Sequence, residues 1–128
     1  MNIQKDEAGI EWTRVHGLPG ATWNPTAGCF HNCMWQMPDG DIIQCYAKTI
    51  AERLAASAYP EGFAHHYWHP HRLDEPLKQK TPHGIFVGSM ADLFGHWVPE
   101  TQLRQVMRVM KRAHWHTFLV LTKNPRRL

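Results

Sequence analysis

The 128-residue sequence lacks the features that mark membrane, secreted and repeat proteins. No apolar run reaches the length of about eighteen residues that a transmembrane helix needs. The amino-terminal segment MNIQKDEAGIEW is polar and mixed in charge, so no secretory signal peptide is predicted. Internal repeats and low-complexity tracts are also missing. Length and composition predict one soluble cytoplasmic domain over residues 1–128, with no membrane contact.

A strong net charge is likewise missing, because the formal charge at pH 7 is only +3. Such a weak excess does not by itself indicate a nucleic-acid-binding protein. Basic residues do concentrate late in the chain, in RQVMRVMKRAH and KNPRRL. Two interpretations stay open for this run: a weak nucleic-acid contact, or the solvated helix face that charged runs more often form. The residues concerned are Arg104, Arg108, Lys111 and Arg112.

Cysteine is scarce, and the three present, Cys29, Cys33 and Cys45, lie close together. An odd number of thiols cannot all pair within one chain, and a reducing compartment favours metal binding or redox chemistry over disulfides. Three alternatives follow from the residues alone. The thiols hold an iron–sulfur cluster, remain unligated, or bind zinc with a fourth ligand from His31 or from the histidines of HHYWHPH (residues 65–71).

Short apolar runs alternate with segments of helical periodicity, and this alternation predicts an α/β fold. GIFVGSM (84–90) and TFLVLTK (117–123) are typical of buried parallel strands, and GIEWTR (9–14) is expected to be the first strand. A helix is predicted between the later two strands, with Pro99 in its first turn. Its buried face is expected to comprise Leu103, Val106, Met107 and Met110.

An earlier helix is predicted from Cys45 to about residue 58, with Ala47, Ile50, Ala51 and Leu54 on one face. The segments 18–28 and 59–82 are rich in Pro, Gly, Asn, Thr or His and are expected to be loops. The predicted order is strand, cysteine loop, helix, strand, helix, strand. The fold class is therefore a parallel sheet of about three strands with two main helices.

Eleven residues, MWQMPDGDIIQ, separate Cys33 from Cys45. PDG is a turn sequence, so this segment is predicted to form a small hairpin. Such a hairpin returns the chain and leaves Cys45 beside the other two thiols.

Six ordered blocks resemble one known family. They are IEWT, TWNPTAGC, CYAKTIAERLA, HPHRLDEPL, FVGSMADLFGHWVP and HWHTFLVLTKNPRRL, and they cover the chain from residue 10 onward. The sequence resembles the phage gp thirty-seven / gp sixty-eight family, which is related to the radical S-adenosylmethionine (SAM) proteins. The resemblance implies phage or prophage origin and a bacterial host cytoplasm as the place of action.

The resemblance also implies an incomplete βα barrel whose first loop carries three cysteines in a C-x-x-x-C-x-x-C pattern. Those cysteines ligate a four-iron four-sulfur cluster, and SAM binds the open iron and is cleaved to a 5′-deoxyadenosyl radical. Carried over to this chain, the ligands are Cys29, Cys33 and Cys45. The first spacing matches the family pattern, whereas the second is longer, eleven residues in place of two.

The same resemblance gives candidate SAM-binding residues and leaves the catalytic residues unassigned. Gln44 replaces the usual aromatic residue before the third cysteine, so Tyr46 is expected to contact the adenine. Ser89 and Asp92 follow the second predicted strand and Lys123 follows the third, where α/β sheets place ligand sites. For Ser89 and Asp92, capping of the next turn is an equal alternative.

The chain is expected to stop after the third strand, where radical SAM barrels usually have about six. Three strands cannot close a barrel, so self-association through the open sheet edge is predicted, with Phe118 and Val120 as apolar contacts. Two functions therefore remain. One is a radical SAM-type enzyme or its cluster-bearing part acting on an unassigned substrate. The other is a non-catalytic phage accessory module that binds a host macromolecule or defence complex and has a structural zinc or cluster site.

Overall fold

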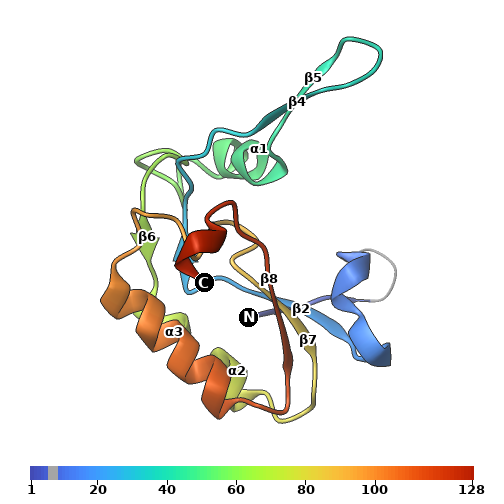
Figure 1. The fold of residues 1–128 in the computed structure, drawn as a ribbon, viewed down its shortest axis with the longest axis vertical. Coiled ribbons are helices and arrows are strands. Elements are labelled where there is room, and N and C mark those ends of the chain that lie inside the picture. Colours follow the sequence, from blue (N-terminus) through green and yellow to red (C-terminus); the bar gives the residue numbers. More distant parts are fainter. Residues whose placement is uncertain (6–8) are drawn as a thin grey trace.

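The computed structural model describes residues 1–5 and 9–128, which form a four-stranded mixed sheet with two helices packed on one face (Figure 1). The strands are β1 (Asn2–Ile3), β2 (Gly20–Trp23), β3 (Thr26–Ala27), β4 (Met34–Gln36), β5 (Ile42–Gln44), β6 (Tyr67–Trp68), β7 (Gly84–Val87) and β8 (Thr117–Val120). The helices are α1 (Tyr46–Arg53), α2 (Glu75–Lys78) and α3 (Glu100–Arg112), with short 3-10 turns η2 (Glu11–Thr13), η3 (Val15–Gly17), η4 (Pro70–Arg72) and η5 (Pro125–Arg127).

The main sheet has the strand order β1-β2-β7-β8. Strands β2, β7 and β8 are parallel, whereas β1 pairs antiparallel with β2. The predicted α/β class is confirmed, but the sheet is mixed because the amino terminus adds an edge strand. The described strands do not close into a barrel.

The core lies between the parallel strands and α3. Residues at matching positions of neighbouring strands point to the same face, so Trp23, Val87 and Val120 form one row across the sheet. Trp23 is completely buried, and its indole N–H donates to the carbonyl of Arg72 at 2.8 Å. This core fixes the carboxyl ends of the three parallel strands relative to one another.

The predicted first strand is wrong. Residues 11–13 form η2, and the first parallel strand is β2, which lies in the segment predicted to be a loop. Gly20 explains the error, because it looks like a loop residue but allows η2 to lie close over the sheet: a Cβ at Gly20 would lie 2.2 Å from Oγ1 of Thr13. Gly84, on the neighbouring strand β7, makes room for η2 in the same way. A Cβ at Gly84 would lie 1.8 Å from the carbonyl oxygen of Thr13.

The predicted helix between the later strands is confirmed as α3, but one residue of its buried face is wrong. Leu103 and Val106 are buried and Met110 packs against the core, whereas Met107 is 44% exposed. Val109 lies on the buried face in its place. The cause is rotational phase: at about 100° per residue, Met107 points about 100° away from the fully buried Val106, whereas Val109 points only about 60° away, on the other side.

The earlier helix, α1, ends at Arg53, about five residues before the predicted end. Ala47 and Ala51 are buried as expected, but Ile50 and Leu54 are more than one-third exposed. The segment 59–82 was predicted to lack regular elements, and this is wrong as well. It contains β6, η4 and α2, each four residues or shorter, too short to produce a periodic pattern.

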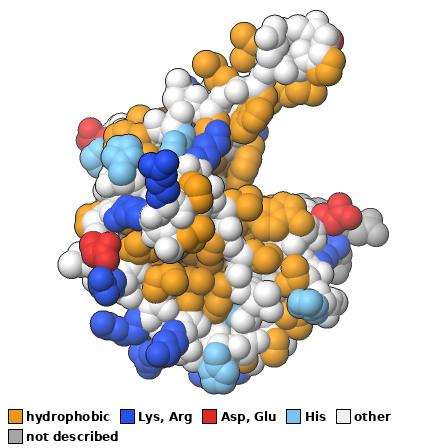
Figure 2. Space-filling view, in the orientation of Figure 1, with side chains coloured by type: hydrophobic (Ala, Val, Ile, Leu, Met, Phe, Trp, Pro, Cys, Tyr) orange, Lys and Arg blue, Asp and Glu red, His pale blue; other side chains and the backbone are white. Residues whose placement is uncertain are grey.

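The predicted hairpin between Cys33 and Cys45 is confirmed. Strands β4 and β5 pair antiparallel with Trp35 opposite Ile43, and Gly40 takes the positive φ of 94° that the turn requires. The hairpin projects from the rest of the molecule beside α1, and hydrophobic side chains cover much of it (Figure 2). Met34 and Ile42 are 61% and 69% exposed.

Within the described residues, no helix is both long and apolar enough to cross a membrane.

Candidate functional site

A cavity of about 320 Å³ lies at the carboxyl ends of the three parallel strands. The chain reaches it by three routes: the loop and hairpin after β2, the turn after β7, and the segment after β8. The wall includes all three cysteines and all four predicted SAM-binding residues, Cys29, Cys33, Cys45, Tyr46, Ser89, Asp92 and Lys123. The rest of the wall is mostly apolar and aromatic, comprising His31, Trp35, Ala47, Phe63, Phe86, Gly88, Ala91, Leu121 and Thr122.

The cysteine loop is fixed at its start by Gly28. The N–H of Gly28 donates to the carbonyl of Met90 at 2.9 Å, and the next N–H, that of Cys29, donates to the carbonyl of Phe63 at 2.9 Å. Gly28 has φ of 86°, and a Cβ there would lie 1.7 Å from the carbonyl oxygen of His65. Only glycine satisfies both the conformation and the close approach. Cys29 is thereby held between the turn after β7 and the loop before β6.

The hairpin brings Cys45 back to Cys33. The N–H of Cys45 donates to the carbonyl of Cys33 at 3.0 Å, one step below the Met34–Gln44 pair of the β-ladder. Cys45 is also the N-cap residue of α1, although its thiol makes no capping hydrogen bond. Strand pairing therefore places Cys45 next to Cys33, although eleven residues separate them along the sequence.

All three cysteines are free thiols and half-buried. Burial raises the pKa of Cys29, and the nearby negative groups Asp92, Cys33 and Cys45 raise it further against a hydrogen bond from the backbone of His31. The nearby Cys33 thiol, through hydrogen bonding and charge, raises the pKa of Lys123. The site thus places several potential negative charges together with one exposed cation.

Asp92 is 5% exposed, and it connects the turn after β7 to the loop after β2 and to the segment after β8. Its carboxylate oxygens bond the N–H groups of Lys123 (2.9 Å) and Phe94 (3.0 Å), the side-chain amide of Asn124 (3.1 Å) and His31 Nε2 (2.9 Å). Burial raises the pKa of this carboxyl group, but these bonds, with one from Thr122, outweigh burial and lower its pKa overall. Since both oxygens have partners within the chain, Asp92 is a positioning residue for the loop ends.

Ser89 and Tyr46 are linked across the cavity wall. The Tyr46 hydroxyl donates to the carbonyl of Ser89 at 2.5 Å, and the amide of Asn24 donates to the Ser89 hydroxyl at 2.8 Å. Burial raises the pKa of Tyr46 to about 12, with a further contribution from the neighbouring Cys45. Tyr46 is therefore a neutral hydrogen-bond donor at neutral pH.

No group of three or more His, Cys, Asp and Glu side chains lies in metal-binding geometry anywhere in residues 1–5 and 9–128. The cysteines share a cavity wall without forming a closed ligand set. His31 lies on the same wall, whereas the histidines of residues 65–71 do not. His65 instead packs on Tyr67 and His69 on His71, with ring centroids 4.8 and 5.7 Å apart.

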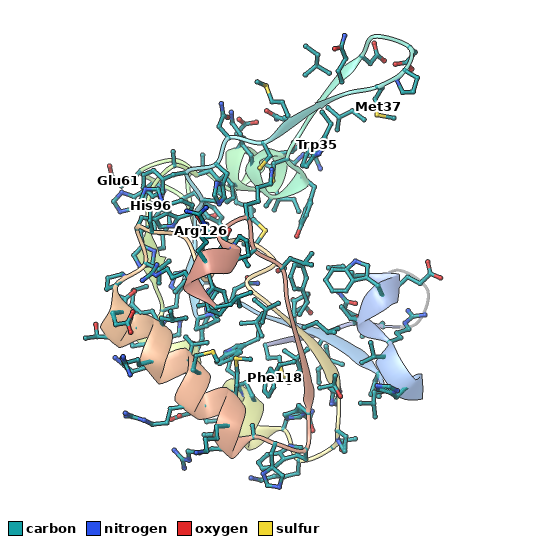
Figure 3. All side chains as sticks on the ribbon, in the orientation of Figure 1. Trp35, Met37, Glu61, His96, Phe118 and Arg126 are labelled. Atoms are coloured by element: carbon teal, nitrogen blue, oxygen red, sulfur yellow. The ribbon has the colours of Figure 1, made fainter. Side chains whose placement is uncertain are left out.

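Several site residues were not predicted from the sequence. Trp35 lies at the base of the hairpin, as Figure 3 shows, and its ring centroid is 5.7 Å from the Lys123 ammonium nitrogen. Phe63, Phe86 and Leu121 supply apolar wall. Asn24 was also missed, although a polar residue directly after a strand is a usable signal once β2 has been located.

No curated protein and no solved structure matches the chain. One family matches residues 7–128, which is almost the whole sequence. The chain therefore belongs to the family described as Protein of unknown function (DUF5131).

Proposed function

We propose that the chain is a radical SAM-like iron–sulfur protein of phage or prophage origin that acts in the bacterial cytoplasm. In this proposal Cys29, Cys33 and Cys45 hold a four-iron four-sulfur cluster and SAM binds its open iron. One observation carries the proposal. Seven residues chosen from the sequence as cluster or SAM ligands, drawn from three separate segments, line a single cavity at the carboxyl ends of parallel strands.

The donor set fits such a cluster. The chain has three cysteines and no fourth, so a four-iron cluster would keep one iron free of protein ligands. The Lys123 ammonium beside the thiols favours an anionic cluster–thiolate group, against the burial that raises the pKa of Cys29. Because the sulfurs are not in ligand geometry, the proposal requires side-chain rotation toward a common centre on loading.

The cluster and SAM, when bound, supply a carbon-centred radical by one-electron reduction and carbon–sulfur bond cleavage. The chain's own residues bind, orient and exclude water. Lys123 offers a cation to an anionic group of the ligand, and the Tyr46 ring, held by its bond to Ser89, offers a flat apolar surface. Phe63 and Phe86 close the wall with apolar side chains, which lowers the local dielectric constant.

A partial (βα) barrel is the matching proposal for the fold. The parallel strands β2, β7 and β8 are adjacent in their sequence order, as in the first strands of such a barrel. The site after their carboxyl ends also agrees with the position of barrel active sites.

One observation favours the second function, a non-catalytic accessory module with a structural zinc ion. His31 Nε2 lies 2.9 Å from Asp92 Oδ2, and a carboxylate partner of this kind commonly orients a zinc-binding histidine. Nδ1 of His31 and the three thiols would then provide four ligands.

Anaerobic reconstitution with iron and sulfide tests the two proposals together. The first predicts a brown protein with a reducible cluster signal that shifts on addition of SAM. Substitution of any one cysteine by alanine should abolish assembly, whereas Met34→Ala, beside Cys33 but without a ligand role, should assemble normally. Binding of one zinc ion without iron, or normal assembly by Cys45→Ala, would contradict the cluster. A cluster signal unaffected by SAM would remove the catalytic part and favour the accessory module.

A further inference from the structure

The carboxyl-terminal part of the chain carries charge of one sign only. Residues 101–128 contain seven of the fourteen Lys and Arg residues and none of the eleven Asp and Glu residues. The first hundred residues therefore have more acidic than basic side chains. The modest net charge of +3 hides two oppositely charged parts.

The fold gathers these cations on one face. Arg104, Arg108 and Arg112 follow one another at four-residue intervals on α3, about 6 Å apart along the axis, and Lys111 lies beside them. All four side chains are exposed, on the helix face opposite the buried Val106. Figure 2 shows Lys and Arg side chains concentrated over α3 and the carboxyl-terminal segment.

The carboxyl-terminal segment joins α3 to the cysteine cavity. Arg127 donates to the carbonyls of Gly95 and Val98, just before α3. Glu100, the only acidic residue of α3, pairs with Arg104 at 2.9 Å and lies 3.9 Å from Arg127. This single carboxylate is shared between two cations and does not neutralise the face.

A second cavity, of about 370 Å³, lies along the same route. Its wall includes Lys123, Arg126, Arg127 and His96, and no acidic residue contributes to it. His96 and Arg126 lie near each other in Figure 3. Lys123 belongs to the walls of both cavities, so the cationic surface continues to the mouth of the cysteine site.

Two exposed aromatic side chains lie beside this surface, Trp35 in the wall of the cysteine cavity and Phe30 next to Cys29 in the chain. Trp35 is 50% exposed and Phe30 is 46% exposed, although large aromatic side chains usually find a buried position. Phe30 packs on Trp97, with ring centroids 4.9 Å apart, which fixes its orientation. An exposed aromatic surface beside a line of cations is the arrangement that single-stranded nucleic acids recognise, since bases stack and phosphates pair.

We propose that a basic track, defined as Arg104, Arg108, Lys111, Arg112, Lys123 and Arg126, binds a single-stranded nucleic acid and leads it to the cysteine cavity. Phosphates pair with the track, and a base stacks on Trp35. An acidic protein would match the charges but not the exposed aromatic rings, and a duplex would keep its bases stacked internally. The inference deepens the proposed function by naming the partner class of that site, but binding itself does not depend on the cluster.

Fluorescence anisotropy with labelled oligothymidine and oligouridine of about 16 nucleotides tests the inference. Binding is expected at about 50 mM salt and should weaken steeply by about 200 mM. Arg108→Gln combined with Arg112→Gln should reduce the magnitude of the log–log salt slope by about 1.4, since each lost contact to a single strand contributes about 0.7. Trp35→Ala should weaken binding roughly ten-fold with the salt slope unchanged.

The matched control combines Arg53→Gln with Lys80→Gln. Both residues are exposed, but Arg53 lies on α1, and the Lys80 ammonium already donates to the carbonyl of Leu77. The control should bind like the parent chain. Binding of either oligonucleotide supports the inference, and the tighter of the two shows which is preferred. Equal loss in the two double variants would overturn it, as would equal affinity for a duplex or for oligoglutamate.

The outcome for the cluster is separable from the outcome for the track. The arginine variants retain all three cysteines, so iron and sulfide content should match the parent protein. Normal cluster content without oligonucleotide binding would refute the track alone. Oligonucleotide binding by a protein that assembles no cluster would refute the proposed function alone.

Discussion

Two buried histidines join the amino-terminal ends of β7 and β8. Nδ1 of His116 accepts the backbone N–H of His83 at 3.1 Å, and Nε2 lies 2.9 Å from the carbonyl oxygen of Pro76. The ring therefore uses one nitrogen as acceptor and the other as donor, which requires the neutral form. Protonation of His116 would place an N–H on Nδ1 facing the backbone N–H of His83, and the two donors would repel each other.

The pKa of His116 predicts a pH-dependent stability. Burial lowers it below 6.5, as does the nearby His83, although hydrogen bonds to the carbonyls of Pro76 and Gln79 act in the opposite direction. The unfolded chain then binds the proton more strongly than the folded chain. Stability should be complete above pH 6.5 and fall as the pH decreases through the folded-state pKa.

Urea denaturation between pH 8 and pH 5 measures this effect. His116→Gln should be less stable at pH 8 but should lose less of the remaining stability on acidification. His114→Gln is the control, because His114 is an exposed neighbour. A parent-like loss of stability in His116→Gln would show that other groups cause the acid sensitivity.

Among individual residues, the sequence predicted the polar residues of the site better than the aromatic and apolar residues of the cavity wall. Cysteines and residues following strands have few alternative roles, so Cys29, Ser89 and Lys123 could be selected by type and position. Aromatic residues have many roles, and nothing local distinguishes Trp35 at the cavity from Trp23 in the core. Which of them lines a cavity depends on contacts between segments distant along the chain.

Among the elements, α3 gives the sharpest mutational contrast. Val106 is completely buried against the sheet, whereas Met107, the next residue, is 44% exposed. Val106→Asp should destabilise the fold by several kcal/mol, about 3 or more, because it buries an unpaired charge. Met107→Asp should change the free energy of unfolding by about 0.5 kcal/mol or less. Equal thermal midpoints for the two variants would show that the helix phase is wrong.

The cysteine loop offers a comparable contrast between glycines. Gly28 and Gly62 both have positive φ, 86° and 80°, but only Gly28 has atoms within 4 Å of an added Cβ. Gly62→Ala should cost about 1 kcal/mol from backbone strain alone. Gly28→Ala should cost more and displace Cys29, because its Cβ meets the carbonyl oxygen of His65.

Thermal unfolding and the reactivity of the three thiols toward a maleimide reagent would measure both effects. Gly28→Ala should lower the thermal midpoint further than Gly62→Ala and change the labelling rate of Cys29. Indistinguishable behaviour of the two variants would mean that the loop adjusts without moving the cysteine.

Strands and turns could be predicted where the residue pattern and the length of the segment indicated the same element. The apolar runs of β7 and β8 and the turn sequence of the hairpin were sufficient, because short-range chemistry determines them. β2 was not predictable, since GATW has neither alternation nor a long apolar run, and its strand conformation comes from pairing with β7. β1, with two residues, gave no pattern at all.

For the whole molecule, self-association stays a prediction. Among the strands of residues 1–5 and 9–128, β8 is an edge of the main sheet, and no described strand pairs with its outer backbone groups. Phe118 and Val120 themselves pack against the core, so an edge contact would use the backbone more than these side chains (Figure 3). The exposed apolar hairpin is a competing surface.

Sedimentation velocity over a range of concentrations separates the two surfaces. Leu119→Lys places a charge on β8, and Ile42→Lys places one on the hairpin, where Ile42 is 69% exposed. If the sheet edge mediates association, only the first variant should become monomeric. A parent chain that is monomeric at every concentration would contradict the prediction, and loss of association in Ile42→Lys alone would assign it to the hairpin.

The hairpin also has a consequence for how cysteine motifs of this kind evolve. Because β4 and β5 close directly on Cys33 and Cys45, residues added in pairs, one to each strand, lengthen the arm without moving either cysteine. An insertion in only one strand would shift the β4–β5 register and turn one cysteine to the opposite face of the hairpin. While the turn is retained, the interval in relatives should therefore differ from eleven by even numbers. A motif search with a fixed interval would overlook those members, and the distribution of interval lengths across the family would check this expectation.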